Sequence, residues 1–114
     1  MTTEYVTMRD GKNVAVTYWD NVKSPRAAVV MVHGMCEYIA RYNDFCEFLG
    51  QSGYNVIGMD NRGFGDTDAD ARGKGYAGMF EATVDDIARE VEIAKARWNV
   101  ERVYVIGHSY GSIL

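Results

Sequence analysis

The chain has 114 residues, of which 47% are hydrophobic and 25% are charged, as in one small globular domain and unlike a disordered or collagen-like chain. Twelve Lys and Arg against 16 Asp and Glu give a formal net charge of −4, which excludes a basic surface for nucleic acid or an anionic membrane. The apolar runs are too short for a membrane-spanning helix. The amino terminus lacks the pattern of a secretory signal, so we expect a cytoplasmic protein.

The first elements predicted along the chain are two antiparallel strands. Residues 4–9 and 13–20 alternate between the two faces of a sheet, and Asp10 and Gly11 between them form a strong hairpin-turn signal. In the second strand, the alternation places Val14, Val16 and Tyr18 on one face and Ala15, Thr17 and Trp19 on the other.

The middle of the chain predicts a strand, a helix and a second strand. Residues 27–32 form an unbroken apolar run, which is typical of a strand that is covered on both faces. Residues 56–59 form another short buried strand. Apolar residues at helical spacing between the two runs indicate a helix that ends at a left-handed Gly53. The residues expected on the buried face of this helix are Tyr42, Phe45, Cys46 and Leu49.

The last third predicts a glycine-rich loop to about residue 80, a long helix and a final strand at residues 103–106. The helix is expected over residues 84–98, with Thr83 as its N-cap and its run of charges, from Asp85 to Arg97, in solvent. Its expected buried stripe is Val84, Ile87, Ala88, Val91, Ala94 and Trp98. The order of elements predicts an open, mostly parallel α/β sheet that is led by an antiparallel hairpin, in one domain or part of one.

Three patterns that resemble binding sites are rejected. Residues 73–78 fit the letters of a dinucleotide-binding loop, but no predicted strand precedes them. The acidic residues at 66–70 lack the glycine and glutamate that complete a calcium loop. Cys36 and Cys46 have no second Cys or His pair at metal-ligand spacing, so we expect two reduced thiols. The sequence therefore predicts neither a cofactor nor a metal.

The chemistry is carried by residues 107–111, which read Gly-His-Ser-Tyr-Gly directly after the last predicted strand. This G-x-S-x-G pattern predicts a tight strand-to-helix turn that exposes the Ser109 hydroxyl at the carboxyl edge of the sheet. Gly107 and Gly111 are the residue types that such a turn requires, because larger side chains would collide there. Ser109 is therefore the predicted nucleophile.

A serine that attacks an acyl group needs hydrogen-bond donors for the oxyanion. We expect one donor to be the backbone N–H of Tyr110, at the start of the helix that follows the serine. The second is expected after the strand at 27–32, where Gly34 allows a close approach and Met35 supplies its N–H. The ring of His33 is expected to be a packing group with its hydrogen bonds satisfied, while the backbone around it serves the site.

These features resemble the amino-terminal half of the α/β-hydrolase fold, in the monoacylglycerol lipase and lysophospholipase-like group of serine hydrolases. Three stretches carry the resemblance: residues 33–42, residues 60–67, which read D-N-R-G-F-G-D-T, and the turn at 107–111. Phe64 departs from the His of many relatives, and Ser112 departs from a frequent Gly. The resemblance implies the spatial strand order first, second, fourth, third, fifth, which leaves the last strand as an exposed edge that favours aggregation.

The resemblance also implies a triad of Ser, acid and His in that chain order. The sequence has two histidines, and neither fits the base: His33 belongs to the oxyanion segment, and His108 should point away from the serine. The triad acid and base are therefore expected outside this chain. We interpret residues 1–114 as a partial domain, truncated after the nucleophile elbow, without the lid and the carboxy-terminal half, and inactive on its own.

For the full-length parent, the resemblance implies a serine esterase that cleaves monoacylglycerols, lysophospholipids or similar acyl esters through an acyl-enzyme. Its partner is a small-molecule ester, with transient lipid contact and no nucleic acid. A proline iminopeptidase-like amidase and a cofactor-free haloperoxidase are alternatives on the same fold. A non-catalytic binding module is an alternative from another class, and the strained serine turn argues against it because a binder does not need such a turn.

Overall fold

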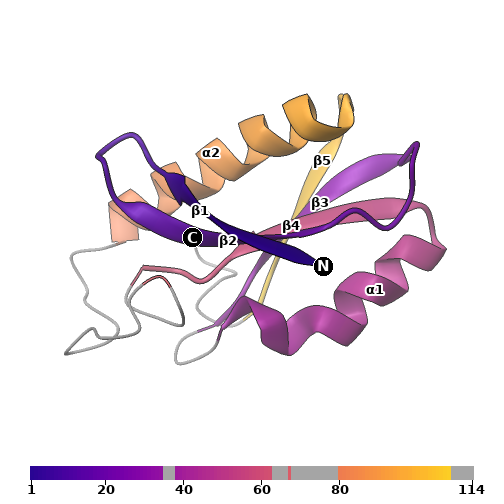
Figure 1. Ribbon diagram of the computed structural model, residues 1–114, viewed down its shortest axis with the longest axis horizontal. Helices are drawn as coiled ribbons and strands as arrows, with labels where there is room; N and C mark the ends of the chain where they lie inside the picture. Colours follow the sequence, from indigo (N-terminus) through magenta and orange to yellow (C-terminus); the bar gives the residue numbers. More distant parts are fainter. Residues whose placement is uncertain (35–37, 63–66, 68–79, 109–114) are drawn as a thin grey trace.

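The computed structural model describes residues 1–34, 38–62, 67 and 80–108, which form a five-stranded sheet with helices on both sides (Figure 1). The strand order β1-β2-β4-β3-β5 confirms the expected order. β2 pairs antiparallel with β1 and β4, whereas β3 pairs parallel with β4 and β5, so the fold class is also confirmed. The strands are β1 (Thr2–Thr7), β2 (Asn13–Trp19), β3 (Ala27–Val32), β4 (Tyr54–Met59) and β5 (Val103–Gly107). The helices are η1 (Ile39–Tyr42), α1 (Asn43–Gln51) and α2 (Phe80–Trp98).

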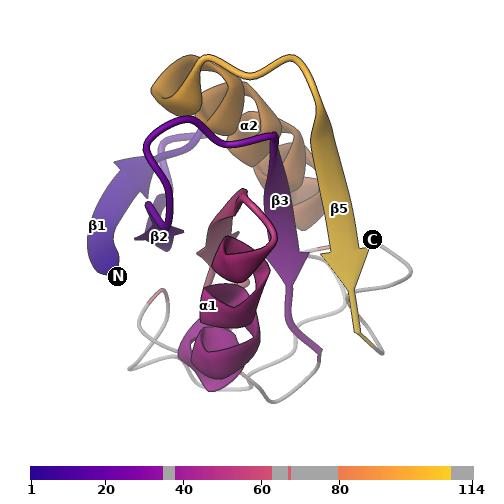
Figure 2. The same ribbon diagram turned by 90° about the vertical axis from the view of Figure 1, so that its right-hand side faces the viewer.

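The two faces of the sheet carry separate hydrophobic clusters, one beside α1 and one beside α2. These two helices lie on opposite sides of the sheet (Figure 1 and Figure 2). The alternation along β2 sends Val14, Val16 and Tyr18 into the cluster that packs against α2. Trp19 points the other way and joins the cluster that includes Cys46 of α1. This confirms the two faces expected from the sequence of β2.

All six residues of β3 are buried, because β3 lies between β4 and β5 and is covered on both faces. β3, β4 and β5 run parallel, so their carboxyl ends meet at one edge of the sheet. The segments that begin at His33, Asp60 and His108 therefore leave the sheet side by side. This edge is where the sequence predicts the chemistry.

The amino-terminal hairpin is shifted from its expected position. β1 spans Thr2–Thr7 rather than residues 4–9, because the chain already turns at Met8, whose N–H donates to the Lys12 carbonyl oxygen at 2.8 Å. Gly11 then adopts a left-handed φ of 89°, which glycine reaches without a steric penalty. The Asp-Gly turn signal is thus confirmed, whereas the expected boundaries of β1 are wrong.

η1 and α1 follow β3, and the chain leaves α1 through Gly53 with a φ of 90°, as expected. The expected stripe is correct for Cys46, which is buried, and for Tyr42 and Leu49, which pack on the same cluster. It is wrong for Phe45, which is 41% exposed. Successive helical residues are rotated by about 100°, so the neighbour of the inward-facing Cys46 turns toward solvent.

α2 begins at Phe80 rather than at residue 84, so Thr83 is a buried residue inside the helix and not its N-cap. The expected stripe is wrong at Val84 and Ala88, which are exposed. The charge run is not wholly solvated either, because two of its acidic residues face the sheet. Among the residues of α2 whose burial is described, the fully buried ones are Thr83, Asp86, Glu90 and Ala94, at the three- and four-residue spacing of one helix face.

β5 forms one edge of the sheet, where Tyr104 and Val105 are 49% and 52% exposed. Cys46 is a free thiol, and burial raises its pKa to about 12, whereas Cys36 lies outside the described residues. No helix in the described part of the chain is long and apolar enough to cross a membrane. The same residues contain no group of three or more His, Cys, Asp or Glu side chains placed to hold a metal ion.

Candidate functional site

The pairing of β3 with β5 places the two predicted catalytic segments side by side. Val32, the last residue of β3, is the register partner of Gly107, the last residue of β5. The backbone N–H of His108 also donates to the Val32 carbonyl oxygen at 3.2 Å. His33 and Gly34 therefore leave the sheet next to the turn that leads to the predicted nucleophile.

Several predicted site residues lie outside the described residues: Met35, Ser109, Tyr110 and Gly111. The rejected dinucleotide pattern at 73–78 and the acidic residues 66, 68 and 70 also lie outside them. The described part of the site consists of His33 and Gly34 before Met35, the chain from Tyr38 after it, and Gly107 and His108 before Ser109.

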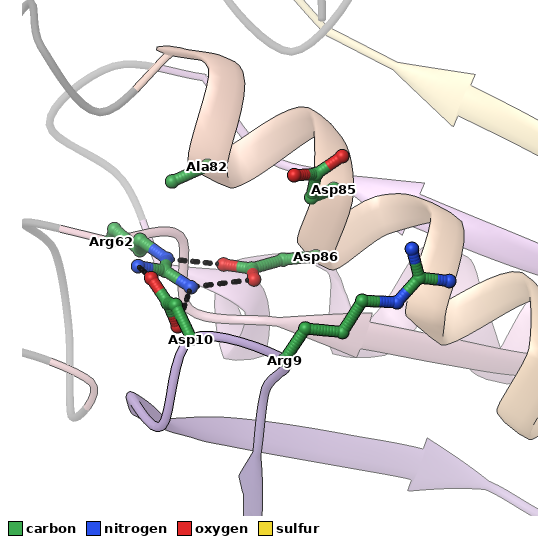
Figure 3. Close-up of a pocket in the computed structure, with 6 residues that line it drawn as sticks. All are labelled: Arg9, Asp10, Arg62, Ala82, Asp85 and Asp86. Atoms are coloured by element: carbon green, nitrogen blue, oxygen red, sulfur yellow. Dashed lines mark hydrogen bonds and ion pairs between the residues drawn. The ribbon is translucent and has the colours of Figure 1, made fainter.

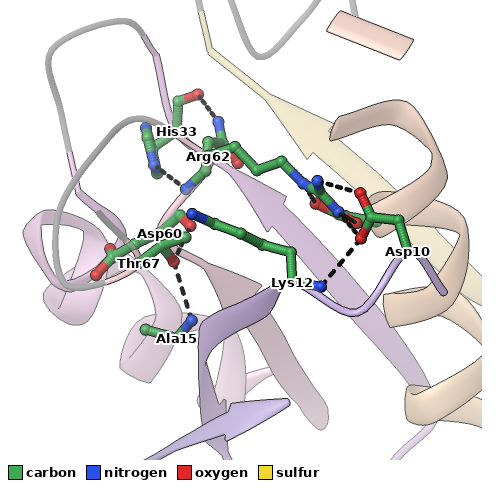
Figure 4. A network of polar contacts seen from close by, with 9 residues as sticks. Asp10, Lys12, Ala15, His33, Asp60, Arg62 and Thr67 are labelled. Atoms are coloured by element: carbon green, nitrogen blue, oxygen red, sulfur yellow. Dashed lines mark hydrogen bonds and ion pairs between the residues drawn. The ribbon is translucent and has the colours of Figure 1, made fainter. Parts of the chain in front are cut away.

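His33 is buried, and each of its ring nitrogens has a hydrogen-bond partner. Figure 4 shows its place in the network of polar contacts beside Asp60 and Arg62. The backbone N–H of Asn61 donates to Nε2 at 2.8 Å, so Nε2 must be the unprotonated nitrogen. Nδ1 therefore carries the proton and donates it to the Gly34 carbonyl oxygen at 2.7 Å. The Asn61 side-chain amide also donates to the His33 carbonyl oxygen at 3.2 Å. The imidazole is thus a neutral support for the start of the loop, as expected of a packing histidine.

Asp60 holds the end of the loop between β3 and η1, which begins at His33. Its side chain is buried and accepts the backbone N–H of Ile39, the first residue of η1, at 2.8 Å. Ile39 packs closely against β4 at Gly58. A Cβ at Gly58 would lie only 2.5 Å from Ile39 Cγ1, so the close packing requires glycine there. The Asp60 backbone carbonyl oxygen in turn accepts the Thr67 hydroxyl, which itself accepts the Ala15 N–H at 2.9 Å. Sequence reasoning placed Asp60 in the family motif but did not find this role.

Arg62 joins three segments of the chain that are distant in sequence (Figure 3). Its side chain is 9% exposed, and the guanidinium binds the Asp86 carboxylate of α2 through Nε at 2.5 Å and a terminal nitrogen at 2.8 Å. It also binds Asp10 of the hairpin turn through its terminal nitrogens at 2.5 and 2.9 Å. A cavity of about 70 Å³ lies beside this cluster, lined by Arg9, Asp10, Arg62, Ala82, Asp85 and Asp86.

The two carboxylates of this cluster have pKa values shifted in opposite directions, although both bind Arg62. Hydrogen bonds from Arg62 lower the pKa of Asp10 to about 2, because this half-exposed carboxylate has little desolvation to oppose them. Burial is the larger effect on Asp86 and raises its pKa against the hydrogen bonds from Arg62. The same hydrogen bonds raise the pKa of Arg62, so the guanidinium stays charged. We interpret the cluster as a structural clamp on the loop after β4.

Tyr42 and His108 meet beside the predicted turn. The Tyr42 hydroxyl lies 3.2 Å from His108 Nδ1, and the ring centroids are 6.3 Å apart at 59°. Tyr42 ends η1, and His108 follows β5. Sequence reasoning expected His108 to point away from the serine and predicted no partner for it.

A larger hollow of about 380 Å³ opens between the amino-terminal strands and η1. Its lining residues are Met1, Thr3, Thr17, Tyr38, Ile39, Ala40 and Asp60. The Thr3 and Thr17 hydroxyls lie 2.9 Å apart, and Asp60 is already bonded to η1. The described lining therefore offers no nucleophile paired with a base.

Comparison with known proteins identifies the family of the chain. The family model described as serine aminopeptidase, S33, matches residues 23–114, which include all three stretches of the resemblance. Phospholipase YtpA of Bacillus subtilis (strain 168) is 34% identical over 90 residues, which are 79% of this chain and 33% of that protein. Monoglyceride lipase of Rattus norvegicus is 24% identical over 105 residues, which are 92% of this chain and 34% of the lipase.

A solved structure gives the same result for the fold. The thermostable carboxyl esterase from Bacillus coagulans, in complex with glycerol, superposes with a TM-score of 0.84 at 26% identity. The match covers 98% of this chain and 37% of the esterase chain. The chain thus spans about a third of the length of the relatives it matches. The sheet order and the family match together show that the chain belongs to the serine aminopeptidase (S33) family of α/β-hydrolases, and the relatives it matches include a phospholipase and a monoglyceride lipase.

Proposed function

We propose that this chain carries the nucleophile and the oxyanion donors of a cytoplasmic carboxylic ester hydrolase that acts on monoacylglycerols, lysophospholipids or similar acyl esters. The observation that carries the proposal is the register of β3 with β5, in which Val32 pairs with Gly107. The oxyanion segment and the serine turn start from these two neighbouring backbone positions. The names of the relatives, a phospholipase and a monoglyceride lipase, support the ester class.

In the proposed mechanism, the Ser109 oxygen attacks the ester carbonyl carbon while a base takes the hydroxyl proton. The carbonyl oxygen becomes an oxyanion that accepts hydrogen bonds from the N–H groups of Met35 and Tyr110. Collapse of the tetrahedral intermediate expels the alcohol, which receives the proton from the base, and leaves an acyl-enzyme. Water then repeats the same steps and releases the fatty acid.

We place the base and its carboxylate partner outside residues 1–114. The sequence has two histidines, and the contacts of both support other roles. His33 is buried, with Nδ1 and Nε2 bonded to Gly34 and Asn61. His108 has its Nδ1 on Tyr42. An enzyme with this chain as its first part therefore needs a further segment to become active.

The proposal is tested by labelling the complete enzyme with a serine-directed fluorophosphonate and by measuring the burst of alcohol from an activated ester. We expect stoichiometric labelling and a burst in the wild type, and neither in Ser109→Ala. Ser24→Ala is the matched control, because it makes the same change on an exposed residue before β3. Labelling that survives in Ser109→Ala would refute the assignment of the nucleophile.

The oxyanion segment is tested by Gly34→Val. A side chain at this position should displace the loop and lower the acylation rate by about 10²–10³, the usual cost of one lost oxyanion donor. Normal turnover in Gly34→Val would remove this segment from the mechanism. The 114-residue chain alone should show no burst, because it lacks the base.

An amidase is the second candidate function, because the matching family model is described as a serine aminopeptidase. The same elbow and oxyanion donors can serve either leaving group. Parallel assays with a monoacylglycerol, a lysophospholipid and an amino-acyl amide separate the two candidates. A kcat/KM for the amide above that for both esters would replace the esterase proposal with the amidase.

A further inference from the structure

The contact between Tyr42 and His108 joins two segments that are 66 residues apart in the chain. The hydroxyl belongs to the residue that ends η1 and precedes α1, and the imidazole belongs to the residue after β5. In the proposed enzyme, the first of these segments follows the oxyanion loop and the second leads into the serine turn. The contact therefore links the two segments whose separation sets the distance between the proposed oxyanion donors.

Both partners of this contact are anchored independently. His108 is held through its backbone N–H, which donates to the Val32 carbonyl oxygen at 3.2 Å. The Tyr42 ring packs against the hydrophobic cluster on the α1 side of the sheet, together with Ile106 of β5. η1 itself is fixed to the sheet by the hydrogen bond from the Ile39 N–H to Asp60. The backbones that carry both side chains are therefore held in place, which lowers the entropy cost of forming the contact.

We propose that Tyr42 and His108 are positioning residues that hold the oxyanion segment after β3 at its working distance from the serine turn after β5. This inference rests on the proposed function and deepens it. The loop after β3 is fixed at its start by His33 and at its end by Ile39, and both of these anchors tie it to the segment after β4. The Tyr42–His108 contact ties η1, which follows this loop, to the residue after β5 through side chains. Loss of the contact lets the two donors drift apart, although neither side chain touches the reacting atoms.

A double-mutant cycle in the complete enzyme tests the proposal, with Tyr42→Phe, His108→Leu and the double variant. We expect each single variant to lower the acylation rate constant by about tenfold, since small misplacements of catalytic groups cost one to two orders of magnitude. The double variant should be no slower than the slower single variant, because one contact is lost in all three. KM, the burst amplitude and the melting temperature should stay near the wild-type values.

Two further variants separate positioning from general damage. His108→Asn keeps a polar group near the place of Nδ1 and should restore most of the rate. Tyr104→Phe removes the same hydroxyl from an exposed tyrosine on β5 and should leave the rate unchanged. A wild-type rate in Tyr42→Phe, additive losses in the double variant, or rate losses that track the melting temperature would each overturn the inference while the Ser109 burst persists. A wild-type enzyme with no burst would overturn the proposed function, and this inference with it.

Discussion

Glu90 is the residue for which the structure predicts the strongest effect of pH on stability. Its side chain is fully buried on α2, and neither carboxyl oxygen has a hydrogen-bond partner among the described residues. Burial raises its pKa well above the ordinary value, and the charge of Asp86, one turn earlier, adds to the effect. The folded protein therefore keeps this proton at pH values where the unfolded chain has lost it.

The sign and size of the effect follow from proton linkage. An unfolded Glu titrates near pH 4.3, and above that pH the folded state holds one proton more than the unfolded state. The free energy of unfolding therefore falls by up to about 1.4 kcal/mol per pH unit until the folded carboxyl itself ionises. Glu90→Gln keeps the shape without the titration and should remove this slope. Glu90→Leu also removes the unpaired polar group and should gain about 1–3 kcal/mol.

The assay is urea unfolding at a series of pH values from about 5 to 8, followed by the fluorescence of Trp19 and Trp98. Glu92→Gln is the matched control, because it makes the same change on the same helix at a half-exposed residue that pairs with Arg9. It should shift the free energy of unfolding by less than about 1 kcal/mol at any one pH. A Glu90→Gln protein with the pH slope of the wild type would refute the reasoning.

Three other predictions concern stability, association and reactivity. Arg62→Leu should cost about 3 kcal/mol in urea unfolding, because Asp86 is left as an unpaired carboxylate with a side chain only 2% exposed; a loss under about 1 kcal/mol would contradict the clamp. Val105→Lys should reduce the concentration-dependent association of the 114-residue chain in sedimentation, because a charge blocks pairing at the β5 edge; unchanged association would point to another surface. In a Cys36→Ser background, Cys46 should react with a thiol reagent only after unfolding, because it is buried and its pKa is raised to about 12; fast labelling of the folded protein would contradict this.

The strands were predictable because their signals are local. The period-two alternation of β2 assigned each of its side chains to the correct face, and the unbroken apolar run of β3 indicated burial on both faces. The spatial order of the strands came from the family resemblance and not from periodicity. The carboxyl-edge location of the proposed site follows from strand direction alone.

The buried face of α2 was mispredicted because hydrophobic periodicity assigns every charge to solvent. Asp86 faces inward because Arg62 reaches it from the loop after β4, and Arg62 is held in turn by Asp10 of the hairpin, 52 residues away. Such a pairing has no local signature in the sequence. With Thr83 and Glu90 on the same face as Asp86, Val84 and Ala88 must turn outward.

The three residues after β4 explain why a loop with no catalytic group belongs to the motif of a catalytic family. Asp60 binds the backbone of η1, Asn61 binds the ring of His33, and Arg62 binds α2 and the hairpin. Each contact leads to a different segment, and two of them hold opposite ends of the loop that is proposed to supply an oxyanion donor. An oxyanion donor works only if its position is fixed before the reaction, so a site of this kind depends on its supporting contacts. We therefore interpret the motif as structural support for the chemistry proposed for the loops after β3 and β5.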